Sequence, residues 1–65
     1  MDRKRIAGRL VRLRGGRSRE EVAAAAGISL SALGMYESGA RIPRDEIKLA
    51  LAACYGVRVE DLFFR

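Results

Sequence analysis

The chemistry that this sequence offers is cationic, and most of it comes from arginine. The 65 residues carry 13 lysines and arginines and 8 acidic residues, for a formal net charge of +5. Residues 1–19 contain eight of these cations and one carboxylate, a local charge of +7 (8 − 1). Such a segment favours an anionic partner, nucleic acid before an acidic protein, although it could also be a solvated helix face. Its cations are Arg3, Lys4, Arg5, Arg9, Arg12, Arg14, Arg17 and Arg19.

The sequence lacks the residues that a catalytic or metal site would need. The chain has no histidine and a single cysteine, Cys54, and its glycine pair at 15–16 is expected to end a helix rather than hold a phosphate. A closed zinc site needs about four Cys, His or carboxylate ligands at suitable spacing, which this chain does not offer. We therefore expect no enzyme, no metal and no cofactor. We expect Cys54 to be a small core residue rather than an activated thiol.

No segment has the pattern of a membrane span or a signal peptide. The longest uncharged run, residues 22–36, is shorter than the ~18 apolar residues of a span and is interrupted by glycine and serine. The charged start, MDRKR, is not followed by an apolar stretch with a cleavage site. We expect one soluble, cytoplasmic domain over residues 1–65, with no contact to a membrane.

The spacing of apolar residues predicts helices along the whole chain and no strands. The first helix carries its apolar residues at i, i+4 and i+7, which is one helix face, and a fourth helix after Pro43 repeats this pattern. A short last turn at residues 59–63 is expected to fold back onto the core. The predicted inward residues are Ile6, Leu10 and Leu13, then Ile47, Leu51 and Cys54, and finally Leu62 and Phe63.

Residues 19–38 predict two helices joined by a very tight turn. Ser18 followed by Glu21 is a capping box that begins the second helix, and Gly27 is expected to end it in a left-handed conformation. Ser29 is the expected cap of a third helix, so only a few residues connect the two. So short a connection forces the helices to cross at a large angle, as in a helix-turn-helix.

Four segments along the chain match the pattern of a known family. They are IAGRLVRLR at 6–14, SREEVAAAAGIS at 18–29, MYESGARIP at 35–43 and GVRVEDLFF at 56–64. Together they resemble the phage-repressor/Cro-type (Xre-type) helix-turn-helix proteins. The chain departs from the pattern in a shorter loop after Arg14, in Arg58 at a position where serine or threonine is common, and in a plain third helix.

The resemblance implies an all-α fold: a compact five-helix, repressor-like DNA-binding domain with the helix-turn-helix at helices two and three. It implies a small transcriptional regulator, a repressor, that binds double-stranded DNA sequence-specifically as a homodimer. The third helix, residues 30–38, would lie in the major groove. No small-molecule effector is evident.

The resemblance also implies roles for particular residues. The base-contacting positions correspond to Leu30, Ser31 and Met35, with Ser29 and Gly34 beside them. The phosphate-contacting positions correspond to Arg19, Arg41 and Arg44, with Arg17 close to them in the expected fold. An ion pair that is common in the family corresponds to Arg14 with Glu37.

A helical wheel of about 100° per residue tests that ion pair from geometry alone. With Ile6 at zero, Arg14 falls near +80°, at the edge of the buried stripe of the first helix. Glu37 flanks the inner side of the third helix, so the two side chains can meet half buried and tie these helices together. The alternative is a loose surface pair worth less than about 1 kcal/mol.

The outward side of the third helix has only apolar and hydroxyl groups, from Leu30, Ser31, Gly34, Met35 and Ser38. Leu30 and Met35 can pack on thymine methyls and Ser31 can donate or accept, so we expect modest base discrimination. Gly34 either lets the backbone approach a partner closely or is merely tolerated. Met35 could contact protein instead of DNA. A protein-interaction module, such as an antitoxin or adaptor, is therefore the alternative function.

Two features at the ends of the chain leave alternatives open. Phe64 is less easily buried than Phe63 and could lie in a dimer interface. The cations at residues 3–5 could form an arm on phosphate or a solvated start of the first helix.

Overall fold

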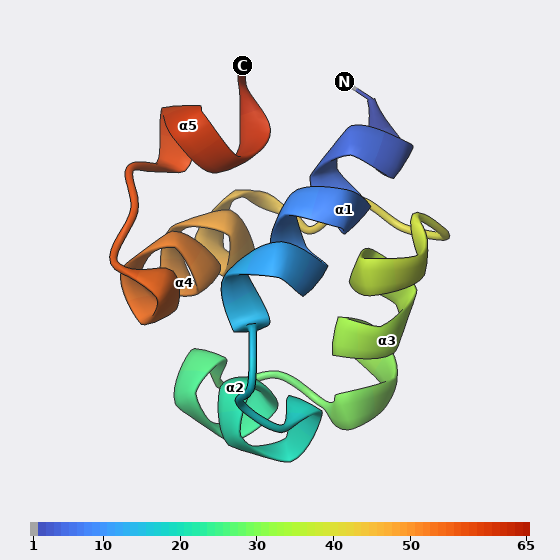
Figure 1. Ribbon diagram of the computed structural model, residues 1–65, viewed down its shortest axis with the longest axis vertical. Coiled ribbons are helices and arrows are strands. Elements are labelled where there is room, and N and C mark those ends of the chain that lie inside the picture. The colour runs from blue at the N-terminus through green and yellow to red at the C-terminus, as the bar shows by residue number, and fades with distance from the viewer. Residues whose placement is uncertain (1) are drawn as a thin grey trace.

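The computed structural model describes residues 2–65, which form five helices and no strand (Figure 1). This confirms the all-α, five-helix prediction, and the third helix has the predicted bounds. The helices are α1 (Arg3–Arg14), α2 (Arg19–Ala26), α3 (Leu30–Ser38), α4 (Asp45–Tyr55) and α5 (Val59–Phe63).

Serines begin α2 and α3, and a glycine separates the two helices. The Ser18 hydroxyl accepts a hydrogen bond from the Glu21 amide at 3.1 Å, and the Glu21 carboxylate accepts one from the Ser18 amide at 3.3 Å. The predicted capping box is therefore confirmed. Gly27 ends α2 at φ +70°, the left-handed conformation that glycine adopts without steric penalty. Ser29 then accepts from the Ala32 amide at 3.0 Å and begins α3.

Gly39, at the end of α3, meets two requirements at once. Its φ of +80° is left-handed, and a Cβ at this position would lie 3.6 Å from the carbonyl oxygen of Arg3 and 3.9 Å from the Cβ of Ala7. The start of α1 therefore passes close to the end of α3. The cations at residues 3–5 belong to the first turn of α1, where Asp2 accepts from the amides of Lys4 and Arg5, and their side chains are exposed.

The helix α1 lies at the centre of the molecule, between α3 and α5 (Figure 1). It packs against both of them, and α2 packs against α3 and α4. This arrangement buries one side of α3 and leaves the other side without a neighbouring helix. The core residues are Ile6, Leu10, Val22, Ala23, Ala26, Leu33, Tyr36, Leu51, Ala52, Leu62 and Phe63.

The inner side of α4 differs from the prediction. Leu51 is fully buried, but Ile47 and Cys54 are only half-buried, and Lys48 is buried although the apolar spacing leaves it out. The Lys48 ammonium lies 5.0 Å from the centroid of the Phe64 ring and 3.5 Å from a carboxylate oxygen of Asp45. A lysine can be buried in this way because its aliphatic stem packs while its ammonium keeps aromatic and acidic neighbours.

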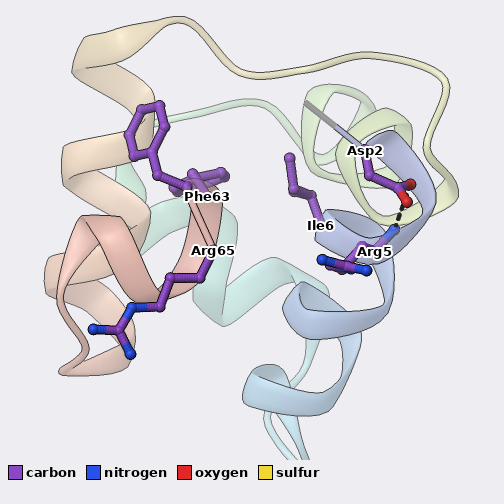
Figure 2. Close-up of a pocket in the computed structure, with 6 residues that line it drawn as sticks. Asp2, Arg5, Ile6, Phe63 and Arg65 are labelled. Atoms are coloured by element: carbon purple, nitrogen blue, oxygen red, sulfur yellow. Dashed lines mark hydrogen bonds between the residues drawn. The ribbon is translucent and has the colours of Figure 1, made fainter.

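The two ends of the described chain lie at the same end of the molecule (Figure 1). A cavity of about 350 Å³ opens between the start of α1 and the end of α5, and no residue of α2 or α3 lines it (Figure 2). Charges of both signs surround its apolar floor. The lining residues are Asp2, Arg5, Ile6, Phe63, Phe64 and Arg65. This cavity is therefore separate from the helix-turn-helix.

Candidate nucleic-acid interface

The turn between α2 and α3 is held by backbone hydrogen bonds. The Ile28 amide donates to the Ala23 carbonyl at 3.0 Å, and the Gly27 amide donates to the Ala24 carbonyl at 3.2 Å. These bonds end α2 and reverse the chain within a few residues, as the sequence predicted. Residues 20–38 are thus two crossing helices and not one continuous rod.

The residues predicted to contact bases lie at the start and on the outer side of α3. Ser29, Leu30, Ser31 and Met35 are exposed, and Gly34 is half-buried. The exposed fractions of Leu30 (47%) and Met35 (37%) are high for large apolar side chains. Within residues 2–65, therefore, no other part of the chain covers this surface, which we call the outer side of α3.

Gly34 has no packing role inside the described part of the protein. A Cβ added there would meet no atom of another element within 4 Å, and the residue sits in ordinary helical conformation. Glycine in a helix interior lowers helix stability by ~1 kcal/mol relative to alanine. Packing within residues 2–65 therefore does not require a glycine at this position.

Two of the predicted phosphate contacts, Arg41 and Arg44, follow α3 directly. The amides of Ala40 and Arg41 both donate to the Met35 carbonyl, at 3.0 and 3.3 Å, so this segment is held against the end of α3. Both arginine side chains are exposed. Arg44 has one loose contact, 3.5 Å to the exposed Glu46, and the Arg41 side chain makes no hydrogen bond or ion pair within residues 2–65.

Glu37, on the buried side of α3, has a carboxylate that is shared by two guanidinium groups. Nε of Arg14 donates to Oε2 of Glu37 at 2.8 Å, and Nε of Arg19 donates to Oε1 at 2.9 Å. The Glu37 side chain is 1% exposed, whereas the exposed fractions are 19% for Arg14 and 53% for Arg19. The three residues link α1, α2 and α3. A carboxylate this deeply buried needs such partners, because an unpaired buried charge is strongly unfavourable.

The Arg14–Glu37 pair that the resemblance implies, and that the helical wheel allows, is present, but sequence reasoning missed Arg19 as a second partner of Glu37. Arg19 was assigned only to phosphate, because the first residue of a second helix in this family faces the DNA backbone. The signal that could have shown the second role is the tight turn itself, which brings the start of α2 back beside the last turns of α3. The hydrogen bond from Arg14 to Glu37 also raises the pKa of Arg14 above its ordinary value.

Arg17 is placed differently from the other predicted phosphate contacts. Its guanidinium lies 5.3 Å from the centroid of the Tyr55 ring, at the end of α4, and its carbonyl accepts from Nη1 of Arg14 at 3.0 Å. Burial raises the pKa of the Tyr55 hydroxyl, and the nearby guanidinium groups oppose that rise. Arg17 is therefore held near the end of α4, whereas Arg19 is bonded to α3 and Arg41 and Arg44 follow α3 in the chain.

Neither a metal site nor a membrane segment is found in the described residues. No three His, Cys, Asp or Glu side chains of residues 2–65 lie close enough together to hold a metal ion. None of the helices α1 to α5 has the length and apolarity needed to cross a bilayer.

Comparison with known protein families identifies the family of this chain. A family model described as helix-turn-helix matches residues 9–62, which is most of the chain. No curated protein and no solved structure matches it. The matched residues begin in α1 and end in α5, and they include the tight turn, the outer side of α3 and the carboxylate shared by two arginines. The chain belongs to the phage-repressor/Cro-type (Xre-type) helix-turn-helix family of DNA-binding regulators.

Proposed function

We propose that this protein is a transcriptional repressor that binds double-stranded DNA sequence-specifically, with α3 as the recognition helix in the major groove. The observation that carries the proposal is the outer side of α3, which is uncovered within residues 2–65, together with exposed arginines at the start of α2 and in the segment that follows α3. An α-helix fits the major groove, and base edges are read there. The repressor role follows the phage-repressor pattern that the sequence resembles.

Phosphate contacts would supply most of the affinity. Arg19 is the first residue of α2, and Arg41 and Arg44 follow α3, and all three side chains are exposed. Arg17 would add a weaker contact, because its guanidinium packs on Tyr55. Arginines that replace counterions on phosphates give strong salt dependence but carry little sequence information.

Base readout would come from few contacts. Leu30 and Met35 are exposed and can pack on thymine methyls, while the hydroxyls of Ser29 and Ser31 can donate to or accept from several bases. Gly34 would let the helix backbone approach the bases closely. Discrimination by one monomer would be modest, so specificity would depend on two half-sites about one helical turn apart and on DNA shape.

Two half-sites require a homodimer, and the α4–α5 side of the molecule offers a surface for one. Leu49 and Phe64 are 60% and 58% exposed there. Residues 45–65 carry three cations and four carboxylates, a net charge of −1 (3 − 4), so two copies could meet there without strong repulsion. The basic residues at 1–19 have no such balance.

The proposal includes a cytoplasmic location, where the protein meets its DNA, and no enzymatic activity. It involves no cofactor or small-molecule effector.

Fluorescence anisotropy with a labelled random duplex tests the phosphate part of the proposal. Four phosphate contacts predict a loss of affinity of about 100-fold or more between about 50 and 200 mM salt. An affinity that barely changes over this range would contradict it. Selection of bound duplexes from a random pool then gives the half-site, its spacing and its symmetry together.

The alternative is a protein-interaction module that presents the outer side of α3 to an acidic or apolar groove. The exposed Leu30 and Met35 favour it, because this surface has no long polar side chain to read bases. A protein that binds no duplex at low salt, but forms a complex with a protein encoded beside it, would establish this alternative.

A further inference from the structure

We infer that Glu37 is a positioning residue for DNA binding. Its carboxylate holds Nε of Arg19, and this orients the Nη1 and Nη2 atoms of Arg19 to bind a phosphate. The inference rests on the proposed DNA-binding function. Glu37, although buried, would then help to set the affinity for DNA through Arg19.

Arg14 and Arg19 both bind Glu37 through Nε, but they differ in what their other nitrogens do. Each donates its Nε to one carboxylate oxygen, at 2.8 Å for Arg14 and 2.9 Å for Arg19. Nη1 of Arg14 also donates to the Arg17 carbonyl at 3.0 Å, and the Arg14 side chain is 19% exposed. It is a structural residue, enclosed on most sides.

Arg19 is fixed at one end only. Its Nη1 and Nη2 make no hydrogen bond within residues 2–65, and its side chain is 53% exposed. A guanidinium held by Nε presents its two outer nitrogens as a fork, and that fork matches the oxygens of a phosphate. The fork belongs to the first residue of α2 and is tied to the last turns of α3, so it lies next to the proposed recognition helix.

Arginine fits both partners better than lysine. A lysine ammonium has three N–H groups on one nitrogen, but it has no planar fork in which one nitrogen holds the Glu37 carboxylate and two others face the phosphate. Holding the fork in advance also removes the entropy loss of ordering a long side chain when DNA binds. Position 19 should therefore favour arginine, whereas an arginine with no protein partner should be replaceable by lysine.

Arg41 provides the matched control. It is exposed, carries the same charge and has no side-chain hydrogen bond or ion pair within residues 2–65. We expect Arg19→Lys to lower the affinity for a random duplex by about 3- to 10-fold, the effect of losing one pre-ordered side chain. Arg41→Lys should change it less than about 2-fold. The slope of affinity against salt should stay close to wild type in both, because the charge is retained.

For Glu37→Gln, the positioning role and general electrostatics predict opposite changes in DNA affinity. Removing a negative charge from a DNA-binding protein should tighten binding, but loss of positioning should weaken it. In the Glu37→Gln background, Arg19→Lys should have no further effect, whereas Arg41→Lys should act as it does in wild type. Thermal melts of each variant verify that the protein is folded at the assay temperature.

The outcomes separate the inference from the function on which it rests. Equal affinities of Arg19→Lys and Arg41→Lys, or tighter binding by folded Glu37→Gln, would overturn the positioning role and leave DNA binding intact. A wild-type protein that binds no duplex would overturn the proposed function itself. If Glu37→Gln does not fold, the comparison of the two lysine variants decides.

Discussion

The α3 side and the α4–α5 side of this protein both expose large apolar residues, but the charges around them differ. On the α3 side, Leu30 and Met35 are exposed, and exposed arginines begin α2 and follow α3. On the α4–α5 side, Leu49 and Phe64 lie among charges of both signs that largely cancel. Exposed apolar area alone does not tell a DNA-binding surface from a protein-binding one, and the surrounding charge makes the distinction.

The largest effect should come from the network that holds α3 in place. Arg14→Ala leaves the buried Glu37 with Arg19 alone, and we expect it to lower the free energy of unfolding by about 2–3 kcal/mol. Arg12, exposed on the same helix, is the control, and Arg12→Ala should change it by less than about 0.5 kcal/mol. Urea denaturation measures both. An Arg14→Ala midpoint equal to wild type would show that the pair is a loose surface contact.

The next largest effect should be the loss of DNA affinity when cations on the α3 side, rather than on the α4–α5 side, are replaced. Replacing Arg41 and Arg44 together by alanine should weaken binding to a random duplex by roughly 30-fold at low salt and lower the salt slope by about two. Replacing Arg58 and Arg65, which pair with Glu60 and Asp61 on the α4–α5 side, should change affinity less than about 3-fold. Equal losses in the two double variants would remove the distinction between the sides.

A smaller effect should come from the apolar surface of the α4–α5 side. Leu49→Ala together with Phe64→Ala should weaken self-association by about tenfold, because both side chains are more than half exposed in the monomer. Sedimentation equilibrium measures this directly. Leu30→Ala with Met35→Ala is the matched pair on the α3 side and should leave self-association unchanged. A monomer at all concentrations in the wild-type protein would exclude a dimer through this surface.

The smallest effect concerns Gly34. Because a Cβ there has free space around it, Gly34→Ala should raise the free energy of unfolding by about 0.5–1 kcal/mol. If the backbone approaches DNA closely at this position, the same variant should weaken duplex binding by several-fold. A more stable protein with unchanged DNA affinity would mean that the glycine is only tolerated.

Local rules predicted the fold well, because each helix boundary depends on residues close to it in sequence. The capping box of Ser18 and Glu21 and the left-handed Gly27 place the tight turn without any tertiary information. The whole five-helix order follows from such boundaries and from the family pattern.

Two side chains show where such reasoning stops. Lys48 is buried because the ring of Phe64 and the carboxylate of Asp45 surround its ammonium, which apolar periodicity cannot register. Arg19 binds Glu37 across 18 positions of sequence, so its role in the network becomes visible only when α2 and α3 are packed. Tertiary neighbours of long charged side chains are not encoded in spacing along one helix.

The central claim, that the outer side of α3 is the DNA-binding surface, is tested most directly by NMR of the ¹⁵N-labelled protein titrated with a random duplex at low salt. The account predicts that amide shifts concentrate at residue 19 and at residues 29–44, while residues 45–65 change little. Shifts concentrated on α4 and α5, with those of α3 unmoved, would contradict it.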